Sequence, residues 1–233
     1  MKINLIDEYN DNGHLIYIEN FVGAHLRGKT FGECIEKLKN EINSYSKWLN
    51  IDIFDEPIEI KTVQSKFSGL KISDADSDII FNSEKKPLSQ SEYENLKSLA
   101  LKSAKDFLAL YLSVPDKDAT SLSPRQTFYG KKPLTANEMY EHTKNVNNYY
   151  FGEIGVDADN KGNIYTCRIK GFEKLEMQPD FLKNKVFAGS YDEEWSLRKL
   201  MRRFIWHDRI HAKAMYRMAT KLFGNSIDNS FKF

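Results

Sequence analysis

The residues best suited to chemistry lie near the C-terminus, in the stretch WHDRIH at positions 206–211. Two histidines, His207 and His211, are four positions apart, and the acid Asp208 lies between them. On a helix, residues four apart differ by about 40° in direction and about 6 Å along the axis, so both imidazoles could bind one metal ion. The same letters could also be a variant of the H-E-x-x-H motif of zinc peptidases, or two histidines that merely share a helix.

The helical phase of this segment predicts which side of the helix carries the histidines. One series follows in steps of three and four: Leu197, Leu200, Phe204, His207, His211, Ala214 or Met215, Met218 and Leu222. This spacing is typical of the buried stripe of an amphipathic helix, so both histidines are expected inside. Asp208 would point about 100° away from the stripe. An aspartate is also short for reaching a metal-bound water, so the peptidase interpretation is disfavoured and Asp208 is expected to be a bystander.

A third histidine has the same setting on another helix. His142 is in step with Met139 and Val146, so it is expected to face the same interior. Burying three imidazoles without partners would be costly, whereas one divalent ion would satisfy all of them. We therefore predict a metal site formed by His142, His207 and His211. The alternative is that each is a core histidine held by hydrogen bonds.

Helical signals dominate the second half of the chain. Four helices are expected there: 89–114, 135–153, 171–187 and 190–222. Three of them begin at the spacing S/T-x-x-E, which is typical of a capping box, and Gly224 follows the last one as a C-terminal cap. The inward stripe of the second helix continues to Tyr149 and Glu153. IYTCRI, at 164–169, is expected to be a short strand or extended piece. The pattern predicts an all-α bundle of about four helices.

The first 67 residues alternate between strand and helix signals. Short β-rich runs, a turn at DNGH and a capping-box spacing at 30–33 predict the order β-β-β-α-β, with a helix on one face of a small sheet. DIIF at 78–81 could add one more strand, and SEKKPLS at 83–89 has the composition of a linker. We therefore predict two domains, an α+β module over 1–86 and the helical bundle over 87–233.

Composition excludes several classes of protein. The 34 basic and 33 acidic residues leave a net charge of +1, which argues against a dedicated nucleic-acid binder. No stretch approaches the roughly 20 apolar residues of a membrane span, and the N-terminus lacks the apolar core of a signal peptide. Cys34 and Cys167 are not in CxxC spacing and are expected to be reduced thiols of a cytoplasmic protein. His14, in a turn, and His25, on a short strand, are expected at the surface.

Two stretches, TANEMYEHTKNVNNYYFGEI and EEWSLRKLMRRFIWHDRIHAKAM, resemble the DinB/YfiT-like superfamily over about residues 88–223. Its members are four-helix bundles that bind a divalent metal through one histidine early in the second helix and an HxxxH pair on a later helix. The family's E-W-[ST]-x-R opening is matched at 194–198. The resemblance implies His142, His207 and His211 as the ligands.

The chain departs from the family at one position. Many members carry another histidine one turn before the HxxxH pair, and here Arg203 stands there. It could place a cation near the metal to hold a substrate carboxylate, or it could be a solvated basic residue whose stem lies on the helix surface.

The N-terminal part shows a weaker resemblance to another family. GAHLRGKTFGECIEKLKNEINSY, residues 23–45, is similar to the strand, turn and amphipathic helix of HicB-like antitoxins. Antitoxins of this type usually join the module to a DNA-binding domain. Here it precedes the metal-binding bundle, so the antitoxin role is not expected.

The DinB-like resemblance implies a metal-dependent enzyme acting on small molecules. Superfamily members include S-transferases and isomerases that use low-molecular-weight thiols, in which a metal-bound thiolate attacks an electrophile. Three histidines also leave a coordination position open, as in catalytic zinc sites, so thiol transfer or hydrolysis is expected. Zinc or nickel is favoured, with iron, manganese or copper as alternatives.

Several residues are candidates for supporting roles around the metal. Tyr149, Glu153 and Arg203 could act beside it, and Glu153 or Glu138 could accept a hydrogen bond from a ligating histidine. The alternative function is a non-catalytic binding or regulatory protein with a structural or vestigial metal. The expected partner is a small-molecule substrate, and a homodimer formed through the bundle is compatible with the sequence.

Overall fold

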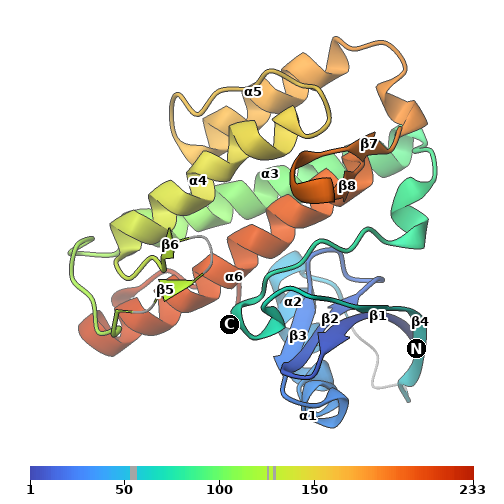
Figure 1. The fold of residues 1–233 in the computed structure, drawn as a ribbon. Coiled ribbons are helices and arrows are strands. Elements are labelled where there is room, and N and C mark those ends of the chain that lie inside the picture. Colours follow the sequence, from blue (N-terminus) through green and yellow to red (C-terminus); the bar gives the residue numbers. More distant parts are fainter. Residues whose placement is uncertain (53–56, 125, 128–129) are drawn as a thin grey trace.

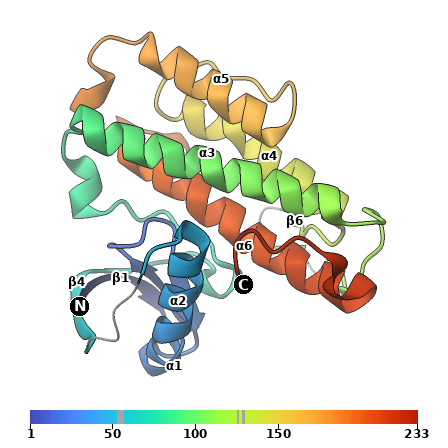
Figure 2. The same ribbon diagram turned by 180° about the vertical axis from the view of Figure 1, so that it is seen from behind.

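The computed structural model describes residues 1–52, 57–124, 126–127 and 130–233. It shows an N-terminal mixed sheet with its own helices, followed by a helical C-terminal part (Figure 1). Seen from both sides, helix α6 (Leu197–Phe223) lies between the sheet and the other long helices (Figure 2). None of the described helices is long and apolar enough to cross a membrane.

The N-terminal sheet has the strand order β3-β2-β1-β4. Its elements follow in the chain as β1 (Lys2–Asn10), β2 (Gly13–Ile18), β3 (His25–Gly28), α1 (Phe31–Glu36), α2 (Leu38–Leu49) and β4 (Glu59–Phe67). Strands β1, β2 and β3 pair antiparallel, and β4 pairs parallel with β1. The predicted order β-β-β-α-β is confirmed, with the helix interrupted at Lys37.

Strands β1 and β2 place alternating side chains on the two faces of the sheet and are largely buried on both, whereas most residues of the edge strand β4 are exposed. Ile3 and Leu5 belong to the large core that also includes α2 and the C-terminal helices. Ile6 and Tyr17 face the other way, into a smaller cluster completed by Trp206 of α6. The sheet therefore contributes to a hydrophobic core that continues across the predicted domain boundary at residue 86, and the boundary itself stays a prediction.

The segment between sheet and helices differs from what its sequence predicts. DIIF, residues 78–81, forms no strand, and the carbonyl groups of its first three residues accept hydrogen bonds from side chains. The carbonyl of Ile79 accepts from Arg202, and that of Ile80 accepts from Gln64. SEKKPLS begins within a 3-10 turn (Asn82–Lys85) that buries Glu84, so this stretch packs against the protein.

The described residues of the helical part include four long helices. They are α3 (Gln90–Ser113), α4 (Ala136–Gly152), α5 (Ile164–Glu176) and α6. Two short antiparallel strand pairs accompany them, β5 (Gln126–Thr127) with β6 (Gly130–Lys131) and β7 (Phe187–Ala188) with β8 (Glu194–Trp195). Helix α3 packs on α5 and α6, and α4 packs on the same two helices. The capping boxes predicted for α3 and α4 are both present, and Gly224 ends α6 with φ of 75°.

Two element predictions in this part were wrong. IYTCRI is not a strand but the first half of α5, which begins where the Asn163 side chain accepts from the backbone N–H of Thr166. Its buried residues follow helical spacing, but they include Arg168, whose charge hides the pattern in the sequence. The helix ends at Glu176, before Pro179, so the helix expected over 171–187 is displaced toward the N-terminus.

The last helix begins six residues later than its sequence suggests, with Ser196 as its N-cap instead of Ser190. Ser190 and Glu193 form no capping box, because Tyr191 and Asp192 between them have φ of 58° and 59°, in the left-handed region. The cap is Ser196, whose hydroxyl accepts from the N–H of Lys199 at 3.2 Å. Glu193 instead forms an ion pair with Lys199.

His14 and His25 were both expected at the surface, but each is partly buried and contacts other side chains. The His14 ring is within 3.0 Å of the Asp7 carboxylate and stacks on Tyr9. His25 packs edge-on against Trp206, with ring centres 6.3 Å apart, and its buried Nδ1 has no hydrogen-bond partner among the described residues. Burial lowers the pKa of His25 to about 4, so the ring is neutral at pH 7.

We expect His25 to make the protein less stable in mild acid. The unfolded chain takes up a proton near the usual pKa of about 6.5, whereas the folded chain does so only near pH 4. The free energy of unfolding should therefore fall as the pH drops below about 6.5, by up to about 1.4 kcal/mol per pH unit from this group. Denaturant unfolding at several pH values should show a shallower fall for His25→Gln, and an unchanged slope would contradict the assignment.

Asp208 is buried in an ion pair between α5 and α6. Its carboxylate accepts from Arg168 at 3.1 Å and from the hydroxyl of Ser103 at 2.8 Å, and both members of the ion pair are fully buried. The expectation that Asp208 lies off the histidine face is confirmed, but it is not a bystander. It joins three helices.

Removing this carboxylate should strongly destabilise the fold. Asp208→Asn leaves the guanidinium of Arg168 buried without a counter-charge, which we expect to lower the free energy of unfolding by about 3–5 kcal/mol. The exposed pair Lys85–Glu194 is a matched control, and Lys85→Ala should cost less than about 1 kcal/mol. Equal losses of unfolding free energy in the two variants, measured by urea denaturation, would show that the buried pair stabilises the fold no more than the exposed pair does.

Candidate metal centre

Three histidines from two helices converge at one place. His142 belongs to α4, and His207 and His211 belong to α6. One potential ligand atom from each lies within 4.8 Å of those from the other two. The ring centres are 4.5–5.0 Å apart, and Nε2 of His207 lies 3.2 Å from Nε2 of His142. The structure thus brings together the three residues predicted as ligands.

The cluster lies at the edge of the core and not in its interior. His207 is 9% exposed, His211 is partly buried and His142 is exposed. The prediction that all three point into the bundle is therefore wrong for His142. An open side is compatible with a site that small molecules can reach.

The reason for this difference is the face that α4 buries. Its buried residues are Ala136, Met139, Tyr140, Thr143, Asn147, Tyr150 and Phe151, a stripe displaced from the one through His142 and Val146. Several of these side chains are polar and form hydrogen bonds inside the protein. The Tyr140 hydroxyl accepts from the N–H of Ile164, and the Asn147 amide donates to two backbone carbonyls. Polar residues of this kind look like surface positions in a sequence.

The three rings are neutral at physiological pH. Desolvation by the surrounding protein is the main cause that lowers the pKa of each, to about 3 for His211 and well below its ordinary value for His207, and it acts on His142 although that residue is partly open to solvent. His142 and His211 also lower the pKa of His207, and His142 lowers that of His211, with Arg203 and Lys132 adding to the effect at His207 and His211 respectively. A neutral imidazole has a free lone pair, which is the form that binds a metal ion.

The donor set fits a divalent ion. Imidazole nitrogens bind zinc at about 2.0–2.1 Å, so two ligands in tetrahedral geometry lie roughly 3.3 Å apart. One pair here is already at 3.2 Å, and the third nitrogen needs only a small side-chain rotation from its present separation. Nδ1 of His207 is buried and has no partner among the described residues.

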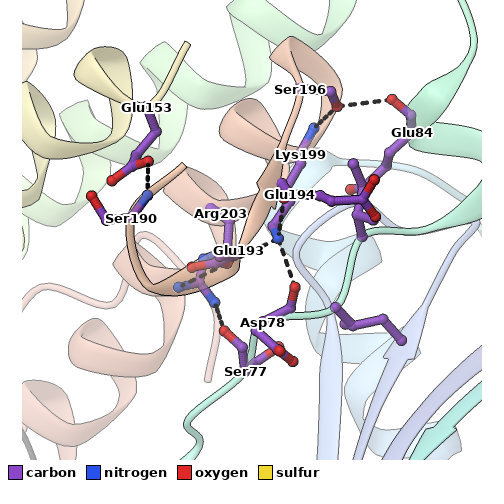
Figure 3. Close-up of polar contacts among 12 residues, drawn as sticks. Ser77, Asp78, Glu84, Glu153, Ser190, Glu193, Glu194, Ser196, Lys199 and Arg203 are labelled. Atoms are coloured by element: carbon purple, nitrogen blue, oxygen red, sulfur yellow. Dashed lines mark hydrogen bonds and ion pairs between the residues drawn. The ribbon is translucent and has the colours of Figure 1, made fainter. Parts of the chain in front are cut away.

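The carboxylates expected beside the histidines are occupied elsewhere. Glu153 accepts from the N–H of Ser190 at 2.8 Å, where it ties the end of α4 to the loop before α6 (Figure 3). Glu138 accepts from the backbone of Leu134 and Thr135 at the start of α4. Neither glutamate makes a described hydrogen bond to a histidine, because each accepts from backbone N–H groups at a helix end. Their role as histidine acceptors stays a prediction.

The ring of Tyr149 contacts Tyr150 and Trp195 and makes no ring contact with a histidine among the described residues. The residue is 37% exposed and its ring meets that of Trp195 edge-on at 6.1 Å. Burial of the hydroxyl and the nearby Glu153 raise its pKa, so it stays protonated.

Arg203 is held inside the structure and is not solvated. It donates to the backbone carbonyl of Ser77 at 2.9 Å and lies 4.0 Å from Glu193 (Figure 3). Its side chain is 11% exposed. Of the two alternatives at this position, the solvated residue is excluded, and a cation within one helical turn of His207 is present.

Two aromatic residues whose rings lie near His207, Tyr150 and Trp206, were not predicted from the sequence as site residues. The ring of Tyr150 lies 6.1 Å from that of His207, and the ring of Trp206 lies 6.4 Å away. Tyr150 is eight positions after His142, close to two helical turns, so helical phase could have found it. Trp206 has no such signal, because its position depends on the sheet that packs on α6.

Comparisons with known proteins leave the family open. A scan against protein-family models found no match, and neither curated proteins nor solved structures gave one. The interpretation of this chain therefore rests on its own residues and their geometry.

Proposed function

We propose that this protein binds one divalent metal ion through His142, His207 and His211 and uses it as an enzyme acting on small molecules, by thiol transfer or hydrolysis. One observation carries the proposal: three neutral imidazoles lie with their ligand atoms within 4.8 Å, and one of the rings is exposed. A closed structural site would use four protein ligands.

The proposal includes the DinB-like assignment. In its favour, the single histidine lies in the first half of α4 and the HxxxH pair lies on the last long helix, as the family pattern requires. Helices α3, α4, α5 and α6 would then be the four-helix bundle of that family, and the sheet would be an added N-terminal domain.

The residues present define what the centre can do. All-imidazole ligation suits zinc or nickel, and iron, copper or manganese would be alternatives. A bound ion would supply Lewis acidity that lowers the pKa of a thiol or a water molecule. The chain itself supplies neutral ligands, the aromatic walls of Tyr150 and Trp206, and the cation Arg203 one turn away.

A non-catalytic protein with a vestigial site is the second candidate, and one observation favours it. Catalytic metal centres usually orient each histidine by a hydrogen bond from its second nitrogen. The corresponding Nδ1 of His207 has no acceptor among the described residues. Metal binding and turnover separate the two candidates.

Metal analysis tests the site directly. The purified protein should bind about one divalent ion, and His207→Ala should lose it, since two remaining imidazoles hold zinc weakly. His14→Ala is the matched control, because this ring pairs with Asp7 and belongs to the sheet. If wild type and His207→Ala contain equally little metal after incubation with zinc or nickel, the central claim is wrong.

Turnover distinguishes an enzyme from a binding protein. The metal-loaded protein should accelerate the reaction of low-molecular-weight thiols with electrophiles, or hydrolysis of small esters and amides, in a screen of such pairs. His211→Ala should abolish the acceleration together with the metal. A tightly bound metal that exchanges no water, as judged by relaxation measurements on a Mn²⁺- or Co²⁺-loaded sample, would point to the non-catalytic alternative.

A further inference from the structure

Arg203 and His207 share their surroundings. Arg203 precedes His207 by one turn of α6, about 6 Å along the helix axis. Its Cζ lies 4.8 Å from the ring centre of Trp206 and 5.6 Å from that of Tyr150. The same two rings lie 6.4 and 6.1 Å from the ring of His207. The guanidinium is therefore part of the wall around the histidine centre.

Arg203 makes no described hydrogen bond to a carboxylate, unlike three other buried arginines. These three donate directly to a carboxylate, at distances of 3.1, 3.1 and 2.8 Å: Arg168, Arg202 and Arg209. Arg203 donates to a backbone carbonyl, and its ion-pair partner Glu193 is 4.0 Å away.

Glu193 has a nearer cation. The same Oε1 atom lies 2.9 Å from Nζ of Lys199, which is fully buried (Figure 3). One carboxylate thus faces both an ammonium and a guanidinium. Aromatic rings on several sides of Arg203 lower the local dielectric constant, so its positive charge acts more strongly on an approaching anion than it would in water.

Buried donors beside Arg203 also lack acceptors. Nε of Arg203 and Nε1 of Trp195 and Trp206 are buried without a hydrogen-bond partner among the described residues. The Trp195 ring centre is 5.6 Å from Cζ of Arg203, and the exposed Tyr149 meets Trp195 from the α4 side. Arg168, Arg202 and Arg209 also have a buried N–H without a partner, but beside Arg203 two indole N–H groups lack one as well. Buried N–H groups are nearly always paired, so this group of three donors favours an acceptor at this place.

We propose that the substrates of this centre are small apolar acids and that Arg203 binds their carboxylate. This inference rests on the proposed function, because the reacting end of such a molecule lies at the metal. A planar guanidinium matches a carboxylate better than a single ammonium does, and the aromatic neighbours suit an apolar body.

Two probes that differ only in charge test the proposal on the full-length protein loaded with Co²⁺. They are 4-mercaptobenzoate and 4-mercaptobenzamide, each with a thiol for the metal and, across the ring, either a carboxylate or a neutral amide. The absorption band of the cobalt–thiolate bond reports binding. The acid should bind about tenfold more tightly than the amide, as expected for a hydrogen-bonded charged group. Arg203→Gln should remove this preference without changing cobalt stoichiometry.

Arg203→Lys is the matched second variant, and it should keep only part of the preference because it retains charge without the two-pronged donor. Equal binding of the two probes by wild type overturns the proposal, whatever the variants do. A preference that survives in Arg203→Gln also overturns it, since the metal alone would then select the acid.

Failure of the metal site gives a different result. If wild type takes up no cobalt, the proposed function is wrong. Calorimetric titration of the metal-free protein with benzoate and benzamide then tests separately whether Arg203 binds a carboxylate. A preference for benzoate that disappears in Arg203→Gln supports the carboxylate site, and equal or absent binding overturns it.

Discussion

The need to pair buried charges on α6 governs how this protein is assembled. The helix lies between the sheet and the other long helices, yet it carries Arg202, Asp208 and Arg209 at buried positions. An isolated buried charge would cost several kcal/mol. Each of these side chains therefore meets an opposite charge from a different element: Glu84 before α3, Arg168 of α5 and Glu41 of α2. These three ion pairs fix the orientation of α6 about its own axis. In that orientation His207 and His211 face α4.

The same constraint links the N-terminal part to the histidine centre. Residues of the segment after β4 hold the basic side chains one and two turns before His207, since Ser77 accepts from Arg203 and Asp78 accepts from Lys199 through their backbone carbonyls. Trp206 inserts its ring among sheet residues while its neighbour His207 faces α4. The sheet is thus a support for one wall of the centre. Arg203 places a positive charge near the neutral imidazoles, which favours the approach of anionic over cationic small molecules.

Local signals predicted those parts of the fold that local interactions decide. The capping boxes at the starts of α3 and α4 are present, because each needs only side chains three residues apart. The same signal failed at Ser190, where Glu193 is drawn to Lys199 and the chain enters the left-handed region at Tyr191. IYTCRI was misread for a related reason: Arg168 looks exposed in the sequence, but the buried Asp208 makes it a core residue.

The sequence by itself determined which histidines could act together. The 3.6-residue period of a helix relates positions in the sequence to directions around the helix, so the spacing of the histidines predicts which of them share a face. Only the tertiary structure decided the character of the site, because contacts between distant residues set it. Polar residues buried on α4 turned His142 to the solvent edge, helix ends claimed Glu138 and Glu153, and the segment at Ser77 held Arg203 beside His207. Burial and pairing energies depend on which partner arrives from elsewhere in the chain, and helical spacing carries no information about that partner.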